Sequence, residues 1–314
     1  MKFKKPKFWD YEKPNLISYL LIPFTLIIII NNFLLSFKKR KKYGKIKTIC
    51  VGNIYLGGTG KTPTTIEIYR LLKERNFNVF TAKKFYKSQV DEEIILKNKT
   101  KYISSKSRDQ ILIDNSDNME KIFIFDDGLQ DRKVKYDLEF VCFDSSVWVG
   151  NGCLIPAGPL REKIDSLKKY DGIFLKDNNN NVAKISNYLK KKNIEIPIFK
   201  TFYKPININK FDKSKKYLAF AGIGNPEDFK KMLLKNDLNI LDHLFFPDHH
   251  IYTVSDILAI KDKANHFDAE IITTEKDYVK IPENEKKNID YLEIDLKFED
   301  ENNLINFLKS KIYE

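Results

Sequence analysis

The sequence predicts an α/β protein with two lobes, each built on a parallel sheet, and an apolar segment near the N-terminus. Short apolar stretches alternate with helical stretches, a pattern typical of parallel strands covered by helices on both faces. A glycine-rich turn at 57–60 follows the first of these stretches, and an uncharged run at 16–37 precedes it. The 314 residues are enough for two domains of ordinary size.

The uncharged run at 16–37 is about as long as a helix that crosses a bilayer. We therefore assign residues 1–45 to a membrane anchor that either spans the bilayer or lies flat in its interface. The basic residues after the run are denser than those before it, which favours a cytoplasmic location for the rest of the chain. An ordinary buried helix is the alternative. The flanking basic residues are Lys2, Lys4, Lys5 and Lys7 before the run, and Lys38, Lys39, Arg40, Lys41 and Lys42 after it.

The charge balance predicts an anionic partner. Lysine and arginine number 55 against 43 acidic residues, a formal net charge of +12. Phosphate or an acidic membrane surface fits this excess. Arginine is sparse, which argues against sequence-specific binding of nucleic acid, because arginine makes most bidentate base contacts. The three cysteines show no CxxC spacing, so neither a zinc site nor a disulfide framework is expected.

The first lobe is expected over residues 46–150. Its predicted strands are 46–51, 79–82, 121–125 and 138–143, and Pro63 begins a helix that continues to about residue 75. Turn residues cluster at 150–161, and we place the lobe boundary there. The second lobe, 151–314, is expected to hold strands at 172–175, 196–200, 217–221, 240–244, 270–274 and 291–294. Its predicted helices are 226–235, 254–265 and 301–312, and the asparagine run at 178–181 is predicted to be a solvated loop.

The glycine-rich turn has the features of a phosphate-binding loop. Glycines let successive backbone N–H groups face phosphate oxygens, and the helix that follows places its positive end at the same anion. Lys61 then reaches the β- and γ-phosphates, and the Thr62 hydroxyl is a ligand for Mg²⁺. A strict version of the motif has glycine at 55, where this chain has Tyr55. The predicted nucleotide-binding residues are Tyr55, Leu56, Gly57, Gly58, Thr59, Gly60, Lys61 and Thr62.

Two aspartates, Asp126 and Asp127, follow the apolar strand at 121–125. The carboxyl ends of strands face the ligand crevice of an open α/β sheet. Two neighbouring carboxylates repel each other unless a cation lies between them, so the pair is a candidate Mg²⁺ site together with Thr62. A polar turn built on Asp-Asp-Gly is the alternative.

Other polar groups have less specific patterns. The run 248–250, Asp-His-His, is suited to proton transfer or metal binding, or is a surface turn. Residues 91–93 read on their own as a solvated acidic face. Arg161 beside Glu162 grips an anion or forms an ion pair at a helix start. Residues 273–277 read as a helix cap.

Taken together, these segments resemble the tetraacyldisaccharide 4′-kinase (lipid A 4′-kinase) family. The resemblance covers most of the chain, including the apolar N-terminal run. The matching stretches are VGNIYLGGTGKTP (51–63), DDGLQ (126–130), NGxLIPAGPLRE (151–162), AGIGNP (221–226), FPDHHxYT (246–253) and ITTEKD (272–277).

The resemblance implies transfer of the γ-phosphoryl group of ATP, with Mg²⁺, to the 4′-hydroxyl of an acylated disaccharide 1-phosphate, which gives lipid IVA. It implies a phosphate-loop (P-loop) kinase-like first lobe, a smaller α/β lobe that closes over the cleft, and attachment to inner-membrane lipids at the cytoplasmic face. By the same resemblance Asp91 is the candidate base, with His249 its partner and Lys61 the third catalytic residue. Glu92 assists Asp126 and Asp127 at the metal. The candidate substrate contacts are Gln130, Arg161 and Glu162.

The chain departs from the family pattern in three places, one of which is an unusually short stretch between residue 86 and Asp91. Residues 82–86 read Ala-Lys-Lys-Phe-Tyr where the family has Ser-Arg-Gly-Tyr, and Asp131 stands where the family has a histidine. The nucleotide motif is intact, so an active kinase is expected. The rival hypothesis is a membrane-bound ATPase that acts as a nucleotide switch for a protein partner. Such switches carry a lysine where this chain has Leu56, and they give 156–162 no role.

Overall fold

The computed structural model describes residues 5–43, 46–86, 89–116, 120–131, 133–177, 181–248 and 250–313. They divide into two units by their internal contacts. The larger unit holds Lys5–Phe85, Leu96–Phe202 and Leu296–Glu314, and the smaller unit holds Tyr86–Ile95 and Tyr203–Asp295. Most of the smaller unit is thus inserted in the sequence of the larger one.

The larger unit is built on an eight-stranded sheet with the order β12-β7-β6-β5-β1-β4-β2-β3. The interior pairs are parallel, and the register sets Val51 of β1 opposite Asp126 of β4. Both strands therefore end at the same edge. The strands are β1 (Lys47–Gly52), β2 (Val79–Lys84), β3 (Tyr102–Ser105), β4 (Ile122–Asp126), β5 (Leu138–Asp144), β6 (Gly172–Lys176), β7 (Ile198–Pro205) and β12 (Ile294–Phe298).

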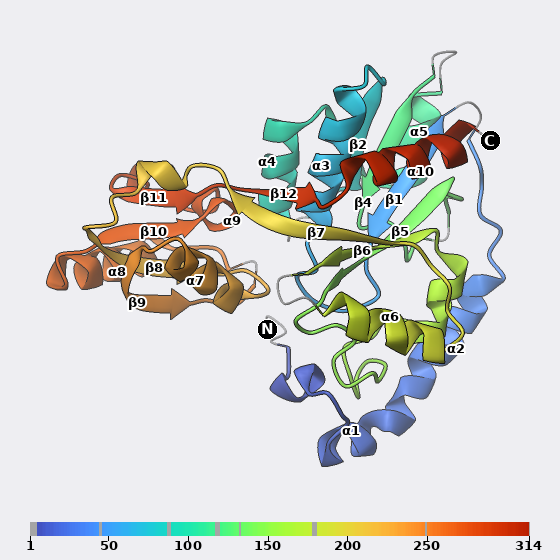
Figure 1. The fold of residues 1–314 in the computed structure, drawn as a ribbon, viewed down its shortest axis with the longest axis horizontal. Helices are drawn as coiled ribbons and strands as arrows, with labels where there is room; N and C mark the ends of the chain where they lie inside the picture. Colours follow the sequence, from blue (N-terminus) through green and yellow to red (C-terminus); the bar gives the residue numbers. More distant parts are fainter. Residues whose placement is uncertain are drawn as a thin grey trace. The chain divides into compact units, whose positions relative to one another are not determined.

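Helices cover this sheet, and α3 (Lys61–Lys73) packs on β1, β2 and β4. Helix α10 (Glu301–Tyr313) lies beside α3 (Figure 1). The Arg70 guanidinium of α3 joins Glu67 at 2.7 Å to Glu301 at 2.9 Å, so the last helix is tied to the helix that begins at the phosphate loop. The remaining helices of this unit include α5 (Arg108–Asp114), α6 (Val182–Lys191) and the short η3 (Ile164–Lys169).

The N-terminal segment of the larger unit consists of η1 (Lys7–Asp10), α1 (Leu16–Leu21), η2 (Ile22–Phe24) and α2 (Thr25–Ser36). Residues Leu16–Ser36 form one continuous helical stretch that is long and apolar enough to cross a membrane, by length and composition only, and little of it is buried. The exposed side chains include Leu16, Leu20, Ile27, Phe33 and Leu34. An apolar N-terminal helix, as predicted, is thus present.

Polar contacts hold this segment against residues 150–161. The Trp9 indole is buried and donates to the Pro156 carbonyl at 3.0 Å, and the Trp9 carbonyl accepts from the Asn151 amide at 2.9 Å. Gly150 fits here because its φ is +56° and a Cβ would lie 2.1 Å from the Trp9 oxygen. Further along, Asn151 Nδ2 donates to the Ser18 hydroxyl at 2.9 Å. The segment is therefore bound to the unit at its beginning.

The other end of the segment is bound as well. In α2, Asn32 Nδ2 donates to the Arg161 carbonyl at 2.9 Å, and Ile29 packs on the main core. The two asparagines that interrupt the apolar run at 31–32 thus include one that bonds the helix to the protein. The segment contacts the same loop near both of its ends.

The smaller unit has a parallel sheet with the order β11-β10-β8-β9. Alternate residues face two cores. Ala219 and Ala221 pack with Leu233 of α7 on one side, whereas Leu218 and Phe220 pack with the α8 side on the other. The elements are β8 (Lys216–Ala221), β9 (Asn239–Phe245), β10 (Glu270–Thr274), β11 (Ile289–Leu292), α7 (Pro226–Lys235), α8 (Val254–His266), α9 (Glu275–Tyr278), η4 (Ile208–Lys210) and η5 (Glu283–Glu285).

The predicted α/β class with parallel sheets is confirmed. The division by contacts differs from the expected boundary near residue 150, because β6 and β7 extend the first sheet and β12 returns to it. The strand expected at 291–294 is instead the junction of β11 and β12. The pattern also missed α4 (Val90–Lys99), β3, α5 and α6, which lack long apolar runs. Of the asparagine run, 178–180 lie outside the described residues.

Candidate nucleotide site and acidic cluster

The phosphate loop connects β1 to α3 in the larger unit. Gly60 adopts a left-handed conformation, with φ of 80°, and immediately precedes the first residue of α3, Lys61. Asn53 Nδ2 donates to the Thr59 hydroxyl at 3.1 Å and to the Gly57 carbonyl at 3.2 Å. The loop is thus cross-braced from inside, and the positive end of a helix of more than three turns lies next to it.

Tyr55 and Leu56 attach this loop to the rest of the unit. Leu56 donates its amide to the Pro159 carbonyl at 2.8 Å. The Tyr55 side chain is 1% exposed, and its hydroxyl contacts Asp10 and Lys5 of the N-terminal segment. Burial raises the pKa of Tyr55 far above its ordinary value, so the hydroxyl stays protonated and donates to Asp10. Tyr55, which stands where the strict motif has glycine, therefore joins the phosphate loop to the N-terminal segment.

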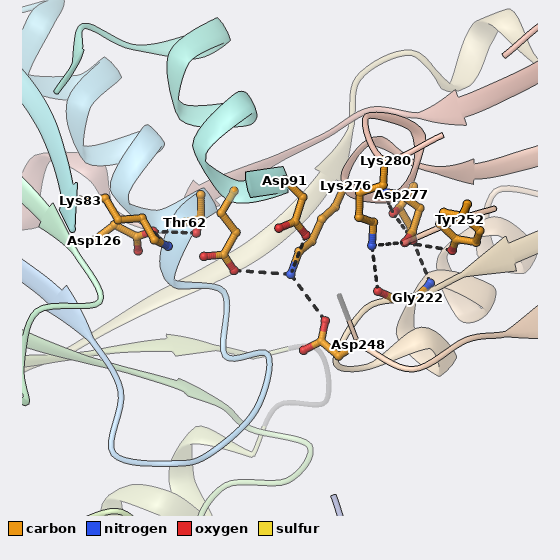
Figure 2. A network of polar contacts seen from close by, with 12 residues as sticks. Thr62, Lys83, Asp91, Asp126, Gly222, Asp248, Tyr252, Lys276, Asp277 and Lys280 are labelled. Carbon is orange, nitrogen blue, oxygen red and sulfur yellow. Dashed lines mark hydrogen bonds and ion pairs between the residues drawn. The ribbon is translucent and has the colours of Figure 1, made fainter. Parts of the chain in front are cut away.

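Asp126 lies at the end of β4 and is completely buried. Its Oδ2 accepts from the Thr62 hydroxyl at 2.9 Å and from Lys83 Nζ of β2 at 2.8 Å (Figure 2). Its Oδ1 is buried and has no hydrogen-bond partner among the described residues. Thr62 and Asp126 were predicted to meet, whereas Lys83 was missed. A lysine inside an otherwise buried strand is the signal that could have found it.

Asp127 faces two cations. Its Oδ1 lies 3.8 Å from Lys61 Nζ and 3.9 Å from Arg161 Nη1. Arg161 also donates to Gln130 Oε1 at 3.1 Å, and Gln130 Nε2 donates to the Asn53 carbonyl at 2.9 Å. The structure thus brings together four of the predicted site residues around the phosphate loop.

Glu162 has a different environment from its neighbour Arg161. Its carboxylate is buried and accepts from Lys169 Nζ at 2.5 Å and from the Tyr170 hydroxyl at 3.1 and 3.2 Å. These contacts join Glu162, which precedes η3, to the C-terminal end of that helix. Asp131 forms an ion pair with Arg108 at 3.0 Å. The Arg108 guanidinium also donates to the Asp127 carbonyl, so this pair holds the turn after β4.

The oxygen atoms at this edge of the sheet suit Mg²⁺. A threonine hydroxyl and two carboxylates are hard donors of the kind that Mg²⁺ prefers, and one buried oxygen of Asp126 still lacks a partner in the described part of the chain. No cluster of three histidine, cysteine or acidic side chains with metal-binding geometry occurs within the described ranges. The set fits an ion that is also held by nucleotide phosphates.

A second polar cluster belongs to the smaller unit. Lys276, in α9, lies among three carboxylates: its Nζ is 3.7 Å from Asp91, 3.4 Å from Glu92 and 3.5 Å from Asp248 (Figure 2). Burial alone lowers the pKa of Lys276, but the surrounding carboxylates outweigh burial and raise it overall. The ammonium therefore stays charged. Asp91 and Glu92, read from sequence as an acidic face, are both largely buried in the first turn of α4.

Asp277 anchors α9 beneath this cluster. Its carboxylate is completely buried and accepts from the Gly222 amide at 3.0 Å and from the Tyr252 hydroxyl at 3.1 Å. It also pairs with Lys280 at 2.7 Å and caps the helix through Thr274 at 2.6 Å. Three of the stretches that the sequence singled out, 221–226, 246–253 and 272–277, thus meet at one carboxylate.

His249, the predicted partner of Asp91, lies outside the described residues. The neighbouring His250 has a structural contact, because its Nε2 lies 3.1 Å from Asp256 Oδ2 at the start of α8. Asp256 and Thr253 form a capping box there. Of the two histidines, His250 is thus a support for the turn.

A buried strand, a glycine loop and a helix, with a threonine hydroxyl and an aspartate at the neighbouring strand end, define a P-loop kinase-like nucleotide-binding protein. Over residues 16–106 and 91–313 the chain matches the family described as tetraacyldisaccharide-1-P 4′-kinase. The chain belongs to this family, and it is an enzyme of the kinase class.

Individual relatives agree with this assignment. The chain is 44% identical over 310 residues to the tetraacyldisaccharide 4′-kinase of Pelagibacter ubique, with 98% of each chain covered. It is 35% identical over 334 residues to the Rickettsia canadensis enzyme of the same name, covering 100% of this chain and 98% of the relative. Its fold matches a crystal structure of LpxK from Aquifex aeolicus in complex with ATP, with a TM-score of 0.68, 23% identity, and coverage of 95% and 100%.

Proposed function

We propose that the protein transfers the γ-phosphoryl group of ATP to the 4′-hydroxyl of a tetraacylated glucosamine disaccharide 1-phosphate, giving lipid IVA in lipid A biosynthesis. The contact of the Thr62 hydroxyl with the buried Asp126 carboxylate, directly after the glycine loop, carries this proposal. This contact joins the phosphate loop to the acidic end of β4, two segments of a nucleotide site that are far apart in the sequence. Family membership then supplies the acceptor.

Phosphoryl transfer requires positioning and charge neutralisation more than covalent chemistry. Lys61 and the loop amides hold the β- and γ-phosphates, and Arg161 adds a second cation near Asp127. Thr62, Asp126 and Asp127 would hold Mg²⁺, which neutralises phosphate charge when bound. Glu92, whose carboxylate also pairs with the Lys276 ammonium, is the proposed fourth residue that assists at the metal.

The acceptor hydroxyl must lose its proton as its oxygen bonds to phosphorus. We assign that proton to the Asp91 carboxylate, with His249 as its partner. Asp91 is 4% exposed and lies beside the Lys276 ammonium, so it is a carboxylate held away from bulk water. A carboxylate is a weak base toward an alcohol, so the proton moves late. Gln130, Arg161 and Glu162 are the proposed contacts to the acceptor.

The N-terminal segment places the enzyme at the surface where its acylated substrate lies. We propose that α1 and α2 lie flat in the interface of the inner membrane, at its cytoplasmic face. Contacts near both ends of the segment join it to residues 150–161, and a helix that crosses the bilayer cannot keep both. The outer apolar side chains then enter the lipid, and the lysines of 38–42 meet anionic headgroups.

The deciding experiment follows γ-labelled phosphate from ATP in the presence of the purified disaccharide 1-phosphate. Stoichiometric transfer to the 4′-oxygen, with little ATP turnover when the acceptor is omitted, is the expected result. An acceptor that lacks only the 4′-hydroxyl is the matched control. ATP hydrolysis at an equal rate with and without acceptor would instead favour the nucleotide-switch hypothesis.

A further inference from the structure

We propose that Lys276 is the positioning residue of the acceptor base, Asp91. One ammonium lies between three carboxylates that come from the first turn of α4 and from the turn after β9. This inference rests on the proposed role of Asp91. The new element is Lys276, which the sequence analysis interpreted only as part of a helix cap.

The charges of the cluster require such a residue. Asp91, Glu92 and Asp248 are like charges within reach of one point, and Asp91 and Glu92 are adjacent in the chain. Without a cation between them they repel, and the first turn of α4 and the turn at residue 248 would separate. A lysine ammonium has three donor hydrogens, so one side chain can serve all three carboxylates.

The distances show what kind of contact Lys276 makes with the three carboxylates. The separations of 3.4 to 3.7 Å are those of ion pairs and longer than short hydrogen bonds. The Lys276 ammonium thus lies at ion-pair distance from Asp91 and orients its carboxylate by charge.

The backbone of Lys276 is itself fixed. The next residue, Asp277, bonds to the Gly222 amide, to Tyr252 and to Lys280, and it caps α9 with Thr274. A helix of four residues has little stability of its own. The buried contacts of Asp277 therefore fix the backbone from which the Lys276 side chain extends. The buried carboxylate of Asp277 thus positions Lys276, and Lys276 positions Asp91.

The experiment compares K276M, K276R and K276Q in the full-length enzyme, with K286M as the matched control. Lys286 belongs to the same unit, pairs locally with Glu283 and lies over the Tyr278 ring, at 5.1 Å from its centroid. For K276M we expect kcat to fall at least about tenfold while the KM for ATP changes less than about twofold. K276R should recover most of kcat, and K286M should behave as the wild type.

A second pair of variants separates this inference from the role of Asp91. D91N should lose nearly all turnover, and D91N/K276M should be no slower than D91N, because Lys276 acts through that carboxylate. Wild-type turnover in D91N would overturn the base assignment itself. An inactive D91N with normal kcat in K276M would overturn only the positioning role.

Folding of the variants is checked by circular dichroism and thermal unfolding. If K276M does not fold, the comparison of K276R with K276Q decides. A restored kcat in the arginine variant and a reduced one in the glutamine variant supports the inference. Equal kcat in the two, or a change confined to the KM for ATP, contradicts it.

Discussion

Lys83 and Asp126 form a completely buried ion pair in the larger unit, with Nζ 2.8 Å from Oδ2. Removing one partner of such a pair leaves an uncompensated charge away from water. For K83M we expect a loss of about 3–5 kcal/mol in the free energy of unfolding, measured by urea denaturation. The double variant K83M/D126N should regain part of that loss. A K83M protein as stable as the wild type would show that the pair is not structurally important.

Lys61, in contrast to Lys83, is expected to matter for turnover and little for stability. Its contact to Asp127 is long, at 3.8 Å, so the fold depends little on it. K61A should reduce turnover about a hundredfold or more, because the phosphates lose their ammonium, while the melting temperature stays close to that of the wild type. Lys73 is exposed on the same helix, and K73A is the control. Near-normal phosphoryl transfer by K61A would refute its assigned role.

Residues with a local motif could be predicted from the sequence, and residues without one could not. Lys61, Thr62, Asp126 and Asp127 follow from a glycine turn and an apolar strand that ends in two acids. Lys83 and Lys276 have partners distant in sequence, and only the sheet order and the fold of the smaller unit bring those partners near. The sequence does show that Lys83 is a charged residue in a strand with buried neighbours, but for neither lysine does it show which carboxylates lie nearby.

Helix α8 begins with a capping box between Thr253 and Asp256. The backbone amide of Thr253 holds the pKa of Asp256 below its ordinary value, with further contributions from the Thr253 hydroxyl and from His250. A carboxyl with a lowered pKa stabilises the fold above the ordinary pKa, and this contribution is lost as the pH falls through the lowered value. Stability from Asp256 is therefore present at neutral pH and absent in strong acid.

We expect D256A to lose about 1 kcal/mol of unfolding free energy at pH 7. Relative to the wild type, this deficit should shrink as the pH falls below about 4, the ordinary value for aspartate. Urea unfolding of both proteins at several pH values measures it. A deficit that stays constant down to the lowest pH at which both proteins fold would exclude the ionised carboxylate as its source.

Helices and strands with a clear periodic pattern of apolar residues were predicted closely. Those with a weak pattern were missed. Helices α7, α8 and α10 and the strands β8 and β10 lie within a residue or so of the predicted bounds. Helix α4 was missed because its apolar residues are few and its first turn is acidic. Those acids are buried beside the Lys276 ammonium, and that contact lies outside any local window of sequence.

At the scale of the molecule, the exposed apolar face of α1 and α2 predicts binding to lipid. Ile27 and Leu34 are 68% and 61% exposed, so I27D/L34D should abolish sedimentation with anionic vesicles while the melting temperature changes little. L258D, at a 48% exposed site on α8, is the control for adding charge to an apolar surface residue. Vesicle binding that survives the double substitution would contradict the proposed orientation.

The insertion of the smaller unit between β7 and β12 has a consequence for biosynthesis. The strand that pairs beside β7 leaves the ribosome only after residues 206–293 have been translated. Until then one edge of β7 is unpaired in the nascent chain. Its backbone N–H and C=O groups can then form hydrogen bonds with other polypeptides. Truncated products that end within the insert should therefore be especially prone to aggregate and to recruit chaperones during translation.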